Sequence, residues 1–204
     1  MGMPMKTQAL ITGASGLLGR ALVKEFLKHD INVIAQYHSN KPSITGNCQW
    51  LPADFSTLEG ISEFLQSNRG TLSHSTYLIN NYGPITYKDI SQLQADDFLY
   101  DYHHNVITAF EITRFLIACS PSLKVVCSMG FEHTAEIKPY RKILTYASAK
   151  NTLVLMHCSF ANQYTHIRFP LIDVPTLKGA AVPSKSGQPV APAEVARKIY
   201  TSMI

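Results

Sequence analysis

Short apolar runs alternate with amphipathic stretches along the whole chain. Strands are predicted at short segments of three to six residues that are rich in apolar side chains: 8–11, 31–36, 49–51, 77–80, 124–127 and 166–169. Helices are predicted where apolar positions recur every three to four residues, at 17–29, 57–67, 94–118 and 192–203, and a further helix that carries Tyr146 runs to about residue 162. The long stretch 94–118 is expected to break near its middle.

Strands that alternate with helices predict βαβ units and a parallel sheet covered on both faces. Because such crossovers are right-handed, we expect an α/β fold with a Rossmann-like, doubly wound parallel sheet. We interpret residues 1–204 as a single domain. The segment 177–192, rich in Gly, Pro and Ser, is interpreted as a mobile loop.

Composition supports a compact fold, since 46% of the 204 residues are hydrophobic and 16% are charged. The net charge of +4 comes from scattered Lys and Arg residues, which argues against a nucleic-acid-binding surface. The four cysteines have no CxxC spacing and the eight histidines form no HxxxH pair, so no metal site is expected. No apolar signal core and no membrane-spanning run are present, and we expect a cytoplasmic protein.

A glycine motif follows the first predicted strand and opens the first predicted helix, in the segment Thr12-Gly-Ala-Ser-Gly-Leu-Leu-Gly19. Such glycines permit a tight turn, a close approach of a diphosphate to the backbone, and close packing of helix on strand. The helix N-terminus adds positive partial charge. We expect a dinucleotide diphosphate to contact Gly13, Ser15, Gly16, Leu17, Leu18 and Gly19; the alternative is an ordinary turn.

The end of the second predicted strand bears on cofactor choice. NAD sites commonly place an Asp or Glu there, to bind the ribose hydroxyls. This chain instead has Tyr37, His38, Ser39 and Lys41, which suit a 2′-phosphate. We therefore expect NADP, with NAD as the alternative if Lys41 is merely solvated.

Tyr146 and Lys150 are four residues apart in a predicted helix and share one face. An ammonium group near a phenol stabilises the phenolate and lowers the pKa of the phenol, which suits acid–base chemistry. The pair could also belong to an ordinary amphipathic helix.

The order of these motifs resembles that of the short-chain dehydrogenase/reductase family over nearly the whole chain. The glycine motif, Asp54 in Ala-Asp-Phe55, and Asn80-Asn81-Tyr82-Gly83 are similar to its nucleotide-binding segments, with Tyr82 in place of the usual Ala. Asn105, which lies 25 residues beyond Asn80, is similar in spacing to the catalytic Asn. Tyr146-Ala-Ser-Ala-Lys150, Pro170-Leu-Ile172 and Pro192-Ala-Glu-Val-Ala196 complete the resemblance.

The resemblance implies roles for individual residues. Tyr146 would donate a proton, Lys150 would bind the nicotinamide ribose and lower the pKa of Tyr146, and Asn105 would hold a relay water. The cofactor would supply the hydride. Cofactor contacts would also come from Asp54, Phe55, Asn80, Asn81, Tyr82, Gly83, Pro170 and Ile172.

Two departures from the family pattern leave alternatives open. In the family, a catalytic Ser lies about a dozen residues before the Tyr, whereas Ser128 lies 18 residues before Tyr146; alignment by strand would place Gly130 at the Ser position. Either Ser128 fills the catalytic role or the role is vacant. The substrate region after residue 176 is short, which implies an open pocket or a partner that completes it, and weakens the expectation of the family's homo-oligomer.

Tyr37-His38 and the segment 53–57 resemble the pteridine-reductase branch of the family, in which Tyr82 would stack on a flat ring or simply pack. The favoured function is an NADPH-preferring reductase of a C=O or C=N group in a small carbonyl or pterin-like substrate. The alternative is a non-catalytic, NADP-binding regulatory module.

Overall fold

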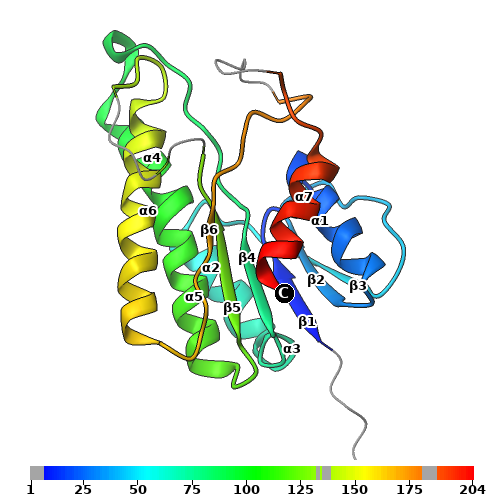
Figure 1. Ribbon diagram of the computed structural model, residues 1–204. Coiled ribbons are helices and arrows are strands. Elements are labelled where there is room, and N and C mark those ends of the chain that lie inside the picture. The colour runs from blue at the N-terminus through cyan, green and yellow to red at the C-terminus, as the bar shows by residue number, and fades with distance from the viewer. Residues whose placement is uncertain (1–6, 132–133, 135–138, 181–187) are drawn as a thin grey trace, which may run out of the picture.

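The computed structural model describes residues 7–131, 134, 139–180 and 188–204 (Figure 1). A six-stranded parallel sheet with the order β3-β2-β1-β4-β5-β6 forms its centre. The strands are β1 (Gln8–Ile11), β2 (Asn32–Tyr37), β3 (Cys48–Pro52), β4 (Tyr77–Asn80), β5 (Val125–Met129) and β6 (Leu171–Ile172). The order reverses between β1 and β4, as the doubly wound fold predicts.

Helices cover both faces of this sheet. On one face, α1 (Leu17–Lys28) packs against α7 (Pro192–Met203). The other face carries α2 (Leu58–Ser67), α3 (Arg69–Leu72), α4 (Ala95–Tyr102), α5 (Thr108–Cys119) and α6 (Leu144–Gln163), and Figure 1 separates the two layers. A 3₁₀ turn, η1 (Ile90–Gln92), precedes α4.

Strands β1 to β5 each contribute side chains to two hydrophobic cores because successive residues point to opposite faces. In β1, Ala9 and Ile11 pack under α1 and α7, whereas Leu10 packs in the core under the other helices. Burial on both faces explains why the strands are continuous apolar runs without polar alternation.

The expected break in the long helix is confirmed and has a defined form. A π-helical segment, η2 (His103–Ile107), separates α4 from α5. Because one extra residue enters the turn, side chains before and after it change their direction, and such π segments often occur at functional sites. Asn105 lies within this segment.

The position of the sixth strand was predicted wrongly. Only Arg168 of the predicted strand 166–169 pairs with β5, through an isolated bridge to Val125, and β6 itself begins at Leu171. Pro170 separates the two pairings because it has no N–H to donate to a ladder. Its carbonyl still accepts a hydrogen bond from the backbone N–H of Ser128 at 3.1 Å.

The expected loop 177–192 is described only in part, since residues 181–187 lie outside the described ranges. Its two described ends pair with each other: Lys178 N donates to Val190 O at 2.8 Å, and Val190 N donates to Thr176 O at 2.9 Å. Pro192 already belongs to α7. Within the described ranges, no helix is long and apolar enough to cross a membrane.

Candidate functional site

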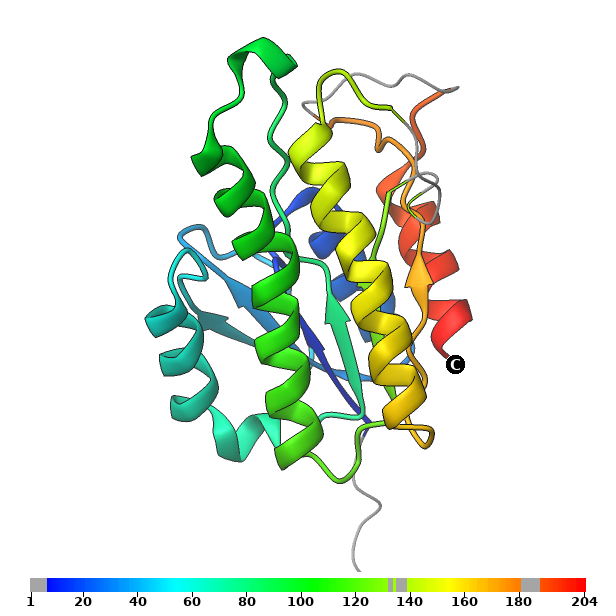
Figure 2. The ribbon, with the colours of Figure 1, turned by 90° about the vertical axis from the view of Figure 1, so that its left-hand side faces the viewer.

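All strands are parallel, so their carboxyl ends lie along one edge of the sheet, at the top in Figure 2. The segments that follow β1, β2, β4 and β5 meet there, on both sides of the point where the strand order reverses. Ligands of open α/β sheets bind at such a point. Most of the residues singled out from the sequence lie on these segments.

The glycine turn after β1 has the backbone that the motif predicts. Gly13 has a φ of 59°, a conformation that other residues rarely adopt. A Cβ on Gly19 would lie 2.7 Å from the Cα of Ala14, so only glycine permits this close packing of α1 on the turn. Arg20 N makes the first helical hydrogen bond, to Gly16 O. The amides of Leu17, Leu18 and Gly19 therefore precede the helical ladder, as an anion site requires.

Asn81 holds the segment after β4 against the glycine turn. Its Nδ2 donates to Thr12 O at 3.0 Å and to Gly13 O at 3.1 Å. The Thr12 hydroxyl in turn accepts from the backbone N–H groups of Asn81 and Tyr82, both at 3.0 Å. Asn81 therefore shapes the proposed nucleotide site through the backbone.

The residues expected to select the cofactor lie at the end of β2 and just beyond it. His38, Ser39 and Lys41 are exposed, and Tyr37 is half-buried with its ring edge-on to Trp50. His38 Nε2 lies 3.9 Å from Asp54 Oδ2, so the segments after β2 and β3 meet here. A hydrogen bond from the Ser56 N–H lowers the pKa of Asp54, whose carboxyl group is ionised.

Two residues expected to bind the cofactor instead lie in the interior. The ring of Phe55 is 2% exposed and packs edge-on against Phe64 and Tyr82. Asn80 is 4% exposed and donates to Thr113 Oγ1 at 3.1 Å and to Ser128 Oγ at 3.3 Å. Both side chains make contacts within the protein, and a cofactor contact at either residue stays a prediction.

Tyr146 and Lys150 lie in the first turns of α6, where the sequence placed them. Lys150 is 4% exposed, and its Nζ donates to Met129 O at the end of β5 at 2.8 Å. The same nitrogen lies 5.4 Å from the centroid of the Tyr146 ring. The Tyr146 ring also packs against Phe131, at 5.7 Å between centroids.

Asn105, which belongs to η2, lies near Lys150. Its Nδ2 donates to Pro84 O at 3.0 Å and to Asp101 O at 3.1 Å, while its buried Oδ1 has no hydrogen-bond partner among the described residues. A Cβ on Gly83 would collide with Asn105 Oδ1 and would lie 3.4 Å from Lys150 Nζ. Gly83, Asn105 and Lys150 therefore meet in one place, with an unsatisfied acceptor beside them that suits a water or a ligand hydroxyl.

Burial shifts the pKa values of both Lys150 and Tyr146. It lowers the pKa of Lys150 to about 8, and the charge of Asp101 acts in the opposite direction. Burial also raises the pKa of Tyr146, and Asp101 raises it further. Tyr146 therefore carries its proton at neutral pH.

Ser128, which the sequence leaves open as the catalytic Ser, lies in β5. It is fully buried, and its hydroxyl makes hydrogen bonds with Asn80 and with His157 Nε2, the latter at 2.7 Å. At Gly130, where alignment by strand led us to expect the family's Ser, a Cβ would lie 2.5 Å from the hydroxyl oxygen of Thr134. Ser128 thus belongs to a polar network that ties β4, β5 and α6 together.

Tyr82 also makes contacts within the protein, through both its hydroxyl group and its ring. Its hydroxyl lies 2.8 Å from His104 Nδ1, and its ring is edge-on to Phe55. Sequence reasoning missed His104, Asp101 and His157. A signal was present for two of them: Asp101 is one helical turn before Asn105, and His157 is two turns beyond Lys150 on the same face of α6.

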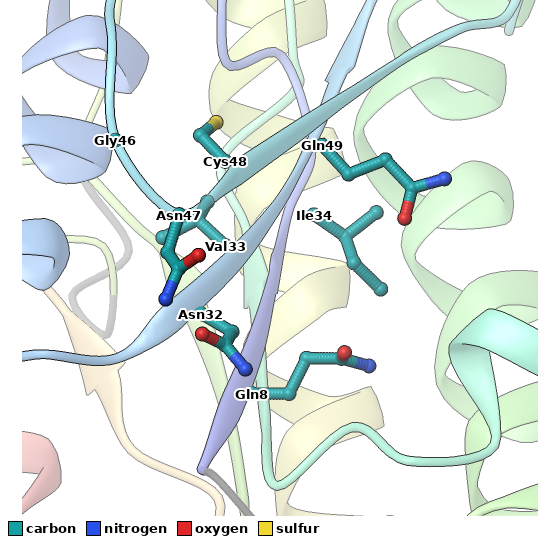
Figure 3. Close-up of a pocket in the computed structure, with 8 residues that line it drawn as sticks. All are labelled: Gln8, Asn32, Val33, Ile34, Gly46, Asn47, Cys48 and Gln49. Atoms are coloured by element: carbon teal, nitrogen blue, oxygen red, sulfur yellow. The ribbon is translucent and has the colours of Figure 1, made fainter.

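Pro170 and Ile172 lie beside the end of β5, where Ile172 O accepts from the Gly130 N–H at 2.9 Å. This places the segment after β6 near Met129, whose carbonyl binds Lys150. A different cavity, of about 430 Å³, lies at the amino ends of β1, β2 and β3 and is lined by polar residues that include Gln8, Asn32 and Gln49 (Figure 3). It is at the opposite edge of the sheet from the glycine turn.

The chain was compared with protein-family models and with curated protein sequences. Residues 7–186 match the family model described as short chain dehydrogenase. No curated protein sequence matches the chain significantly.

Solved structures share the fold. A short-chain dehydrogenase/reductase from Serratia marcescens superposes with a TM-score of 0.83 at 16% identity, covering 98% of this chain and 92% of that one. An NADH-dependent reductase, A1-R′, described as responsible for alginate metabolism, gives 0.84 at 18% identity, with 98% and 89% covered. BdcA in complex with NADPH gives 0.82 at 17%, with 96% and 86% covered. Because the chain covers 86–92% of these three structures, the expected shortening of the C-terminal substrate region is not supported. The matches also give no support for the pteridine-reductase branch.

Proposed function

From the premise that this chain belongs to the short-chain dehydrogenase family and is an NAD(P)-dependent oxidoreductase, we propose that it is an NADPH-preferring reductase of C=O or C=N groups. The observation that carries the proposal is the convergence of Asn105, Tyr146 and Lys150 at the carboxyl ends of β4 and β5. A module that only binds a nucleotide has no need of a buried ammonium beside a phenol.

In this proposal, the bound cofactor supplies a hydride from its nicotinamide. Tyr146 donates the proton to the substrate oxygen or nitrogen. Its raised pKa supports this direction, because the phenol is protonated when the substrate arrives. Lys150, whose ammonium lies beside the Tyr146 ring, stabilises the phenolate that results and binds the ribose.

Asn105 completes the proton path. Its unsatisfied Oδ1 accepts a hydrogen bond from a water that returns a proton to the Lys150–Tyr146 pair. The two hydrogen bonds of its Nδ2, to Pro84 O and Asp101 O, fix the direction of that oxygen. The π segment η2 is therefore the element that orients the relay.

Two features support NADPH over NADH. His38, Ser39 and Lys41 are exposed beyond β2 and free of the acidic side chain that NAD sites place there. Asp54 follows β3 instead of β2, and its carboxylate lies 3.9 Å from His38 Nε2. The rest of the proposed nucleotide site lies elsewhere. The diphosphate contacts the glycine turn, at Gly13, Ser15, Gly16, Leu17, Leu18 and Gly19. The nicotinamide lies near Asn81, Gly83 and the segment 170–172.

The first experiment is a fluorescence titration with NADPH and NADH, followed by loss of absorbance at 340 nm with diketones, aldehydes and quinonoid dihydropterin. Tyr146→Phe removes the donated proton and keeps the ring. We expect this variant to bind NADPH as the wild-type protein does and to lose turnover by at least about a hundredfold. Turnover that survives in Tyr146→Phe would contradict the proposed role of Tyr146.

The second candidate function is a regulatory module that binds NADPH without catalysis. The observation that favours it is the burial of Ser128, whose hydroxyl bonds to Asn80 and His157, and the sequence aligns Gly130 by strand with the family's Ser. Tight NADPH binding by wild-type protein with no turnover of any substrate in the panel would favour this alternative.

A homo-oligomer is proposed on the basis of exposed apolar side chains on α4, η2, α5 and α6. Leu99 and Leu155 are each 68% exposed, and Ile107 and Phe110 are each 38% exposed. Such residues are often covered by a second subunit. Light scattering on the purified protein tests this, and a monomer at working concentration would contradict it.

A further inference from the structure

Phe131 lies two residues beyond β5 and is adjacent to both groups that the proposed reaction needs. The N–H of Gly130, directly before it, donates to Ile172 O at 2.9 Å, in the segment proposed to lie near the nicotinamide. The ring of Phe131 contacts the ring of the proposed proton donor, Tyr146, with 5.7 Å between centroids and 53° between planes. A substrate that takes a hydride from the nicotinamide and a proton from Tyr146 therefore lies beside Phe131.

A tight turn holds Phe131 in this place. The backbone N–H of Phe131 donates to the Thr134 hydroxyl, and the backbone N–H of Thr134 donates to Phe131 O at 2.9 Å. Asn151 Nδ2, on α6 directly after Lys150, donates to Thr134 O. Because the turn is bonded to the helix that carries Tyr146, the rings of Phe131 and Tyr146 are held in one arrangement.

Tyr140 extends this aromatic surface. Its ring lies edge-on to Phe131, at 5.4 Å between centroids and 69° between planes. The segment that carries Tyr140 is bonded to the segment after β4, because Lys88 N donates to Lys142 O at 2.9 Å. We call the row of rings formed by Tyr146, Phe131 and Tyr140 the aromatic wall.

The aromatic wall is partly open to solvent. All three of its side chains are half-buried. By comparison, the ring of Phe55 in the core is 2% exposed, and Met129 at the end of β5 is 5% exposed. Each ring of the wall therefore keeps surface that a ligand at the carboxyl end of β5 can cover.

The geometry of the aromatic wall suits a further aromatic ring. Aromatic rings prefer tilted or edge-on contacts with about 4.5–7 Å between centroids, because the face of each ring is negative and its edge is positive. Both contacts within the wall, of Phe131 with Tyr146 and of Phe131 with Tyr140, have this form. An aromatic ring of the substrate gains the same kind of contact, whereas a saturated ring of equal size gains only the burial of its surface.

We propose that the aromatic wall binds an aromatic ring of the substrate, and that the substrate is an aryl ketone or an aryl aldehyde. This inference rests on the proposed function and names the substrate class of the same site. The carbonyl carbon accepts the hydride of NADPH, and the carbonyl oxygen takes the proton of Tyr146. The products are an aryl-substituted alcohol and NADP⁺, with Phe131 and Tyr140 as the residues that determine specificity.

The experiment measures kcat/KM with NADPH for acetophenone and for cyclohexyl methyl ketone, which differ only in whether the ring is aromatic or saturated. Conjugation lowers the intrinsic reactivity of acetophenone, so the readout is the ratio of the two values, compared between variants. We expect Phe131→Leu to lower the ratio of acetophenone to cyclohexyl methyl ketone about two- to tenfold. We expect Tyr140→Leu to lower the same ratio.

Two further variants separate the aromatic contact from a general loss of structure. Phe131→Tyr keeps a ring and is expected to keep the wild-type ratio. Phe160→Leu is the matched control, since Phe160 is a half-buried ring of α6 that lies 14 residues beyond Tyr146, or about 21 Å along the helix. We expect this control to keep the wild-type ratio. An unchanged ratio in Phe131→Leu overturns the proposal, as does an equal decrease in Phe160→Leu.

A second readout does not need turnover. Benzamide and cyclohexanecarboxamide, which have the same two kinds of ring and no reducible ketone, are titrated into the protein and followed by NMR of its labelled Phe rings. We expect benzamide to bind more tightly to wild-type protein, and the difference to disappear in Phe131→Leu. Equal affinities in wild-type protein overturn the proposal. If wild-type protein reduces no ketone or aldehyde, the proposed function fails, while this titration still decides whether the aromatic wall binds an aromatic ring.

Discussion

The Oδ1 atom of Asn105 occupies the space that a Cβ on residue 83 would need. The segment after β4 and the π turn η2 therefore approach each other as closely as a glycine allows. This contact brings the buried acceptor of Asn105 next to Lys150, whose Nζ would lie 3.4 Å from the same Cβ. The glycine of the Asn80-Asn-Tyr-Gly83 motif thus serves the proposed catalytic centre as well as the nucleotide site.

Gly83→Ala is expected to displace Asn105 and to reduce kcat by about a hundredfold, because small displacements of catalytic groups are costly. Steady-state kinetics with the best substrate of the panel measures this. Gly70→Ala is the matched control, since a Cβ on Gly70 meets no atom within 4 Å. Equal activity in the two variants would contradict the proposed role of the contact.

Ser128→Ala is expected to destabilise the protein without abolishing turnover. The change leaves Asn80 Nδ2 and His157 Nε2 without their shared partner in the interior, which costs about 1–3 kcal/mol of unfolding free energy. Denaturant unfolding measures the free energy, and kinetics measures the turnover. A loss of turnover with unchanged stability would instead restore Ser128 as a catalytic residue.

His157 is expected to make the protein less stable in mild acid. Burial lowers the pKa of His157 from 6.5 to about 4, so the unfolded chain binds more protons than the folded chain between these values. Stability is therefore complete above about pH 6.5 and declines as the pH falls toward 4, by up to about 3 kcal/mol.

Unfolding by urea at pH 4.5 and at pH 7 tests this, with His157→Gln as the comparison. The glutamine keeps a hydrogen-bonding group and has no charge to bury. We expect the variant to show a smaller difference between the two pH values than the wild-type protein. An equal difference would mean that other groups cause the acid sensitivity.

Lys41→Glu is expected to weaken NADPH binding by about tenfold and to leave NADH binding nearly unchanged. The reason is the loss of one charge-assisted contact to the 2′-phosphate. Fluorescence titration with both nucleotides measures the ratio. Lys198→Glu is the control, since Lys198 is an exposed residue of α7 that pairs with Glu194. Equal weakening of both nucleotides in Lys41→Glu would count against the NADP assignment.

Much of the fold was predictable because the sequence pattern is local. The apolar runs of β1, β4 and β5, the periodicity of α1 and α7, and the break in the long helix all depend on residues close in sequence. Prediction was wrong where a local pattern met a backbone constraint: the apolar run 166–169 does not form the sixth strand, because Pro170 interrupts the pairing with β5.

The sequence by itself determined the glycine turn, with Gly13 at positive φ, and the helical spacing that puts Tyr146 and Lys150 on one face. Both depend on backbone geometry over a few residues, which side-chain identity largely dictates. Only the tertiary structure decided that Ser128 pairs with His157, 29 residues away, and that Asp101 meets Thr145, 44 residues away. Such contacts depend on how strands and helices pack, and no spacing along the chain encodes which buried polar group faces another.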